Sequence, residues 1–366
     1  MISFLEKFID NFFGRGESAV TVAPFDGALK FNQYLEEADV FAELEDLEDI
    51  ASNGRDIFVA VGERVLRYTD GSAVEIAKFP GRVTGLCLIS GEELAVGING
   101  QSVRLVGGRH DGRTWEAAAG KRFNSVNSVA SSLSGSLLVT DGSQTQSVDR
   151  WCHDLMTHGR TGRLVEINTD TGETRELATG MAYAFGACAT TEGETWACES
   201  WRHRIVCVRG ARAGQSVLDS LPAYPSRITP AEGGGFWLTA FIARTQLVEF
   251  VLRENDYRRR MMEEIDPRYW VAPKLSSGNS FLEPLQGAHI KTMGVLKPWA
   301  PPASYGLVIR LSPNGEPIYS LHSRSGGRNH GVVAVAECKK ELYAIAKGSQ
   351  RILRLAIGEI EKELRQ

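Results

Sequence analysis

The chain has 366 residues, a formal net charge of −4 and 43% hydrophobic residues, with 38 glycines and 6 methionines. This length fits one large all-β domain as well as two ordinary domains, and the many glycines favour short strands and tight turns over long helices. Charges of both signs are interspersed, so the basic surface needed to bind nucleic acid is not expected. The 6 cysteines have neither CxxC nor Cys/His spacing, which indicates neither structural zinc nor a disulfide framework.

Residues 1–18 are predicted to form an amphipathic helix. Phe4, Phe8, Ile9 and Phe12 recur at helical spacing, with charged residues on the other side. The segment lacks the basic region and cleavage site of a secretory signal, and the chain has no apolar run long enough to span a bilayer, so we expect a cytoplasmic protein. The apolar face of this helix needs a partner. It packs either against the chain's own body or a second copy in a homo-oligomer, or against the surface of a membrane.

From Leu47 onward one unit recurs six times: a short apolar strand, a turn rich in Gly, Ser or Asn, and two further strands. The first unit is LEDIASNGRDIFVAVGERVLRYTDGSAVEIAKF, and hairpin turn sequences recur at 69–71, 170–172 and 313–315. Repeats of about 40 residues with such turns are typical of propeller blades. The predicted fold class is therefore all-β, a six-bladed β-propeller over residues 19–366 in a single domain. The strand that closes the ring is expected at residues 19–25.

Two helical insertions interrupt the repeats. In blade three, residues 144–159 are predicted to form a short helix that carries Trp151 and His153. In blade five, residues 247–303 contain a predicted helix, LVEFVLRENDYRRRMMEEI, followed by an irregular, proline-bounded segment. A loop of this length is typical of a lid or binding element, so a cap over the site is expected, with an interface or a simple decoration as the alternative.

Several blades resemble a known group of propellers. TDGS at 140–143, the helical insertion and TGRLVEINTDTGETREL resemble the blade-three signature of strictosidine synthase-like proteins, and ACESWRHRIVCVRG at 197–210 resembles their blade-four signature. These proteins lie within the gluconolactonase, senescence-marker protein and paraoxonase propeller superfamily. The resemblance extends from about Gly27 to Leu355 and is strongest for the branch that contains adipocyte plasma membrane-associated protein. It implies small-molecule chemistry at the top of the central channel.

The resemblance also suggests one cofactor. Hydrolytic members of the group hold calcium at the channel mouth, and the matching positions here are Glu48, Asn127, Phe185 and Ser226. Phe185 offers no lone pair and Ser226 only a neutral hydroxyl, so Glu48 and Asn127 alone keep the pattern of metal ligands. The plant strictosidine synthases use a glutamate for amine–aldehyde condensation, and because Val333 stands at that position, this reaction is not expected.

The same alignment brings His330 and Arg227 to the channel mouth. If Glu48 and His330 lie within hydrogen-bonding distance, they form a general base, and Arg227 stabilises a developing oxyanion. These three are the predicted catalytic residues. The predicted substrate-binding residues are Asn127, Phe185, Ser226, Trp151 and His153. The predicted function is hydrolysis of an ester, a lactone or a related small molecule; the alternatives are a small-molecule-binding or interaction propeller without catalysis, and a metal-free enzyme of other chemistry.

Overall fold

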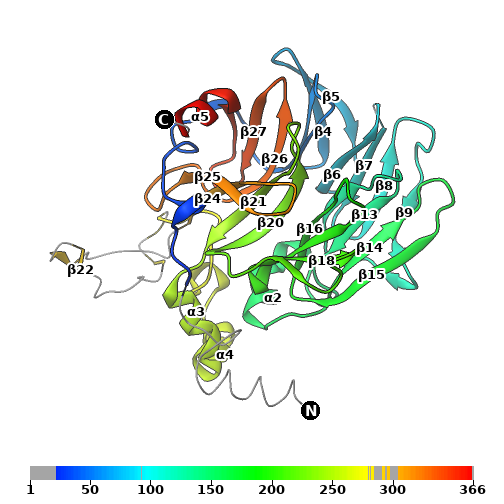
Figure 1. Ribbon diagram of the computed structural model, residues 1–366. Coiled ribbons are helices and arrows are strands. Elements are labelled where there is room, and N and C mark those ends of the chain that lie inside the picture. Colours follow the sequence, from blue (N-terminus) through cyan, green and yellow to red (C-terminus); the bar gives the residue numbers. More distant parts are fainter. Residues whose placement is uncertain are drawn as a thin grey trace.

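The predicted fold class is confirmed. A computed structural model describes residues 22–364 except 92, 279, 281, 284–290, 293–294 and 297–303, so the predicted helix at residues 1–18 lies outside the described part. Six four-stranded antiparallel sheets surround a central channel as the blades of a propeller (Figure 1). Within the first five blades the strands follow chain order from the channel outward, and the innermost strands of all six blades contact one another in a closed ring.

The strands of the first five blades are as follows. Blade one contains β2 (Leu47–Ser52), β3 (Ile57–Val61), β4 (Arg64–Thr69) and β5 (Ser72–Lys78). Blade two contains β6 (Val83–Ser90), β7 (Glu93–Ile98), β8 (Ser102–Val106) and β9 (Thr114–Trp115). Blade three contains β12 (Val126–Ser131), β13 (Leu137–Asp141), β14 (Gly162–Ile167) and β15 (Thr174–Met181). Blade four contains β16 (Ala184–Ala189), β17 (Thr195–Glu199), β18 (Arg204–Arg209) and β19 (Ser216–Leu218), and blade five contains β20 (Ala223–Pro230), β21 (Phe236–Ala243), β24 (Gly306–Leu311) and β25 (Pro317–Ser323).

Blades pack face to face, which explains why their middle strands are buried and largely apolar. Every residue of β3, β7 and β21 is buried, because a strand covered on both faces has no solvent side for polar residues. Between β4 and β5 the turn residues Asp70 and Gly71 have φ values of 48° and 85°. This left-handed geometry suits the Asp-Gly pair of a two-residue hairpin turn.

The ring is closed in blade six, where β26 (Val332–Cys338), β27 (Glu341–Ala346) and β28 (Arg351–Ala356) are joined by β1 (Asp39–Glu43) from the other end of the chain. Phe41 of β1 packs edge-on against Tyr68 of blade one at 5.2 Å and Tyr343 of blade six at 5.1 Å between ring centres. The prediction of a closing strand at 19–25 was wrong. Residues 22–25 contain no strand, and Phe25 instead stacks on Tyr305 of blade five.

The helices of the two insertions lie on one side of the propeller. The 3₁₀ helix η3 (Val148–Arg150) and α2 (Trp151–Met156) follow β13, whereas α3 (Gln246–Arg253) and α4 (Asn255–Glu264) follow β21 (Figure 1). The helix predicted over 247–265 is thus two helices, because Glu254 leaves the helical region with ψ at 80°. Met156, Val251 and Met261 share one buried cluster, which joins the two insertions.

One further helix, α5 (Ile357–Leu364), follows blade six and was not predicted. None of the helices in the described part of the chain has the length and hydrophobicity needed to cross a lipid bilayer.

Candidate functional site

The guanidinium of Arg227, on β20, closes the channel where the innermost strands begin. It donates hydrogen bonds to the backbone carbonyl oxygens of Asn127 (2.7 Å), Thr84 (3.0 Å), Glu48 (3.3 Å) and Val333 (3.3 Å). Its Nε lies 3.1 Å from the Asp49 carboxylate, and its carbon lies 5.1 Å from the centre of the Phe185 ring. Arg227 is only 5% exposed, its terminal nitrogens donate to four carbonyl oxygens, and its Nε faces the Asp49 carboxylate without a hydrogen-bond partner in the described structure. The guanidinium is therefore not placed to stabilise an oxyanion.

Two buried carboxylates balance the cations at the mouth. Glu48 lies 2.5 Å from the ammonium of Lys347 and 3.6 Å from Arg82. Burial raises the pKa of Glu48, but Lys347, Arg82 and Arg227 together hold it below its usual range, so the group stays ionised. Burial raises the pKa of Asp49 to about 6, although Arg227 opposes this change.

The residues at the mouth do not fit the expected calcium ion. The Asn127 amide oxygen accepts a hydrogen bond from the Thr140 hydroxyl at 2.7 Å, and the Glu48 carboxylate is paired with Lys347. The carbonyl oxygens that converge on the mouth already surround the guanidinium of Arg227, whose charge repels a divalent cation. Among the described residues, no group of three His, Cys, Asp or Glu side chains is arranged to hold a metal ion.

The structure does not join Glu48 and His330 into a general base. His330 is buried, with Nδ1 at 2.5 Å from the Ser304 hydroxyl and Nε2 at 2.9 Å from the carbonyl oxygen of Arg324. Burial also lowers its pKa. Both ring nitrogens of His330 have other partners, and Glu48 is held by Lys347. The prediction that Glu48 and His330 form a hydrogen-bonded pair was therefore wrong.

The structure places four of the predicted substrate-binding residues at or above the channel mouth and directs the fifth, His153, elsewhere. Ser226 is buried in the sheet, with its hydroxyl 2.7 Å from that of Thr239, and Asn127 and Phe185 are buried at the channel mouth. Trp151 lies above the mouth on α2, edge-on to Phe241 at 5.5 Å. His153 instead faces Trp270, at 4.7 Å between ring centres.

Aromatic side chains fill the space above Arg227. Phe185 contacts Phe241 at 5.7 Å, and Tyr183 stacks on Trp201 at 4.5 Å between ring centres. Phe185, Phe241 and Tyr183 are buried, and they belong to the same hydrophobic cluster as Trp151 and Trp201. The channel is therefore capped from above by packed rings, and Trp201 is the member of the cap that also reaches a cavity beside it.

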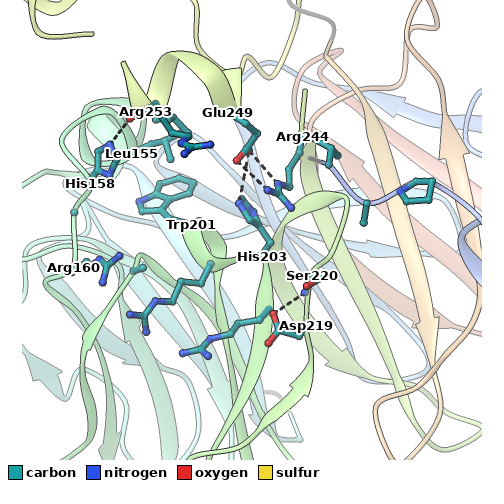
Figure 2. A pocket seen from close by; sticks show the side chains of 18 residues that line it. Leu155, His158, Arg160, Trp201, His203, Asp219, Ser220, Arg244, Glu249 and Arg253 are labelled. Atoms are coloured by element: carbon teal, nitrogen blue, oxygen red, sulfur yellow. Dashed lines mark hydrogen bonds and ion pairs between the residues drawn. The ribbon is translucent and has the colours of Figure 1, made fainter. Parts of the chain in front are cut away.

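That cavity is a pocket of about 860 Å³ between the two helical insertions and blade four. Its apolar lining includes Leu155 of α2, Leu252 of α3 and Trp201 of the 3₁₀ helix η4 (Ser200–Arg202), together with residues 22–24 near the N-terminal end of the described chain. His203 ends η4 with a φ of 53° and turns the chain into β18. Figure 2 shows Trp201 and His203 between the α3 side chains Arg253 and Glu249 on one side and Asp219 on the other. The volume suits a small organic molecule.

Arginines dominate the charge of this pocket. The lining contains two carboxylates, Asp219 and Glu249, against five arginines: Arg160, Arg202, Arg204, Arg244 and Arg253. Even with Glu199, which pairs with Arg202 and Arg204, positive charge exceeds negative. Burial lowers the pKa of His158 to about 4 and that of His203 well below its usual value, with nearby arginines adding to both shifts. Both imidazoles are thus neutral near pH 7.

Glu249 organises one end of the pocket. Its carboxylate accepts hydrogen bonds from Arg244 at 3.1 and 3.0 Å and from the Tyr224 hydroxyl at 2.9 Å. Nε2 of His203 lies 3.8 Å away. Buried charges of opposite sign are therefore held in fixed positions at this end of the pocket. Arg160 and Arg253 lie at the opposite rim, where both side chains are exposed.

Sequence reasoning missed this pocket. The run Ser-Trp-Arg-His-Arg at 200–204 is dense in groups that bind anions and aromatic rings, and it was the available signal. The remaining arginines come from α3 and from the segments after α2 and β21, which only the folded chain brings together.

Comparison with known proteins supports the expected resemblance. No protein-family model matches the sequence. The chain is 24% identical over 225 residues to adipocyte plasma membrane-associated protein from Salmo salar, which covers 60% of this chain and 47% of that protein. It therefore spans about half the length of the curated relative that it matches.

Solved structures agree on the fold. A putative gluconolactonase has a TM-score of 0.53 at 13% identity, with 87% of this chain and 91% of that chain covered. A gluconolactonase from Xanthomonas campestris has a TM-score of 0.53 at 12% identity, with 87% and 88% covered. The structural neighbours are thus gluconolactonase-like six-bladed propellers, and at these identities the likeness concerns the fold alone.

Proposed function

We propose that this chain is a metal-independent propeller that binds a small organic anion in the pocket between α2, η4 and α3. The observation that carries this proposal is the excess of arginines around a cavity of about 860 Å³ whose floor includes Trp201. A guanidinium binds carboxylate or phosphate oxygens in pairs, and an indole with two leucines accommodates an apolar or aromatic body. The channel mouth is a poorer candidate, because Arg227 and the aromatic cap fill it.

Calorimetric titration tests the proposal. Aryl and alkyl carboxylates and phosphate monoesters are compared with their uncharged amides and alcohols, at low and raised salt. We expect only the anions to bind, with an affinity that falls as salt increases. In the variant Arg160→Gln/Arg253→Gln, which changes two exposed rim residues, the affinity should fall about 10-fold, since each removed charge contributes a fraction of a kcal/mol.

The matched control is Arg55→Gln/Arg109→Gln, which removes the same charge from exposed positions in blades one and two. It should bind as the wild type does. Equal binding of charged and uncharged compounds, or equal weakening in the control, would contradict the proposal.

Hydrolysis of an ester or lactone in this pocket is the second candidate. The gluconolactonase-like neighbours suggest it, and the specific observation in its favour is that neutral His203 lies 3.8 Å from Glu249. A neutral imidazole beside a carboxylate is an arrangement used for general-base catalysis. A panel of lactones and aryl esters, assayed with wild type and His203→Gln, tests this: turnover that the variant loses supports hydrolysis, and no turnover of any compound leaves binding as the function.

A further inference from the structure

One guanidinium contacts all six blades. Arg227 belongs to blade five, and its partners come from the innermost strands of the five others. These partners are the carbonyl oxygens of Glu48 in blade one, Thr84 in blade two, Asn127 in blade three and Val333 in blade six, and the ring of Phe185 in blade four. No strand ladder connects neighbouring blades, which meet pairwise through side-chain packing and single hydrogen bonds, such as those from the Leu86 N–H to Asp49 and from the Asn127 amide to the Ala184 carbonyl oxygen. Arg227 differs from these pairwise links because one group touches every blade.

The oxygens around Arg227 require a positive charge. Four carbonyl dipoles direct their negative ends at one point, and the carboxylates of Asp49, at 3.1 Å, and Glu48, at 3.9 Å, add negative charge there. Oxygens brought together away from water repel one another unless a cation or hydrogen-bond donors lie between them. Within the described part of the chain, Lys347 and Arg82 pair with Glu48 but do not donate to Asp49 or to the four carbonyl oxygens.

The backbone of Arg227 is held in place from both sides. Its N–H donates to the Thr239 hydroxyl at 3.1 Å. On the other side, Gly186 of blade four has a φ of 94°, and a Cβ there would lie 2.7 Å from the Cα of Arg227. Only glycine permits this approach. The backbone of Arg227 is therefore fixed, and the four hydrogen bonds and the ion pair with Asp49 hold its guanidinium at the channel centre.

We propose that Arg227 is a built-in cation that holds the six blades together at the channel mouth in place of a bound metal ion, and that its removal exposes a latent cation-binding site. The ligands of that site are the four carbonyl oxygens with the carboxylates of Glu48 and Asp49. Oxygens of this kind and number match what calcium requires. The inference is independent of what binds in the pocket between α2, η4 and α3.

The test uses thermal unfolding of three full-length proteins. Wild type should keep the same Tm with chelator, with calcium and with low-millimolar guanidinium. Arg227→Ser removes the charge and opens space, so its Tm should fall by about 4–7 °C. Added calcium or guanidinium should recover part of that loss, because either cation can occupy the ring of oxygens.

Arg310→Ser is the matched control. Arg310 is also buried and donates to the carbonyl oxygens of Phe236, Leu311 and Gly234, but all three lie in blade five, and no carboxylate in the described part of the chain pairs with it. Its variant should lose stability with no recovery by either cation. If Arg227→Ser does not fold in cation-free buffer, its refolding yield with and without each cation gives the same comparison, and Arg227→Lys, which keeps a charge, should fold.

Three results would overturn the inference. These are an Arg227→Ser variant that neither calcium nor guanidinium stabilises or refolds, equal recovery in Arg310→Ser, and a chelator-dependent Tm in the wild type.

Discussion

Replacing Glu249 by glutamine should change stability and anion affinity in opposite directions. Glu249 is 8% exposed and carries a negative charge at the wall of a basic pocket. The amide keeps an acceptor for the Tyr224 hydroxyl, but it takes the counter-charge away from Arg244, which now donates to the carboxylate at 3.1 and 3.0 Å. Weakening a buried pair in this way should lower the free energy of unfolding by about 2–3 kcal/mol.

The affinity should rise because the same change removes a repulsive charge. An anion near the centre of a pocket of about 860 Å³ lies roughly 6–8 Å from the wall, where unit charges interact by about 2 kcal/mol at an effective dielectric constant of roughly 20. Solvent in the pocket reduces this to about 1 kcal/mol, so binding should tighten about 5-fold. Urea unfolding and calorimetric titration of Glu249→Gln measure the two effects.

The control for this prediction is Glu194→Gln. Glu194 is a buried carboxylate held by Arg212 at 2.8 Å and by the Trp196 indole at 2.8 Å, and it does not line the pocket. It should lose a similar amount of stability with no change in affinity. If Glu249→Gln binds the anion more weakly than wild type while remaining folded, or if both variants tighten binding alike, the electrostatic account of the pocket is wrong.

Two further predictions concern the fold. Phe41→Ala should lower the free energy of unfolding by about 2 kcal/mol, because Phe41 of the closing strand packs between Tyr68 and Tyr343. The control Phe250→Ala, at a site 51% exposed, should lower it by less than about 0.5 kcal/mol. Equal urea midpoints for the two variants would refute this prediction. Hydrogen bonds from Arg212 lower the pKa of Glu194 from 4.5 to about 2, so its stabilising contribution is complete above pH 4.5 and is lost as the pH falls towards 2. The stability difference between wild type and Glu194→Gln should therefore shrink over that range, and a constant difference would show that the carboxylate is not held by charge.

The blades could be predicted because their signals are local. Apolar runs and hairpin turns lie within each repeat, so the six units from Leu47 onward match the six blades observed, although each blade has four strands and the repeat indicated three. The closing strand could not be located in this way, since Asp39–Glu43 is short and its choice of β28 depends on the packing of Phe41 between blades one and six. The break at Glu254 divides a segment whose composition suits one continuous helix, and the predicted helix at residues 1–18 stays a prediction.

Less of the candidate site than of the fold could be predicted from the sequence. The family resemblance predicted that Glu48, Asn127 and Arg227 lie together, and the structure brings them together. The resemblance could not say which atoms would pair with Arg227, because its carbonyl partners belong to strands far apart in the sequence. His330 was assigned to Glu48 from its blade position alone. In the folded chain, Ser304, at the end of the blade-five insertion, is its partner instead. The basic pocket depends on segments of three blades, and no single run of residues reveals it.

A crystal structure with the tightest anion from the titration panel tests the central claim most directly. The account predicts the anion beside Trp201, with its charged group facing the arginines of the pocket and with the hydrogen bonds of Arg227 unchanged. A ligand in the channel mouth, in contact with Glu48 and with Arg227 displaced from the backbone carbonyl oxygens, would contradict it.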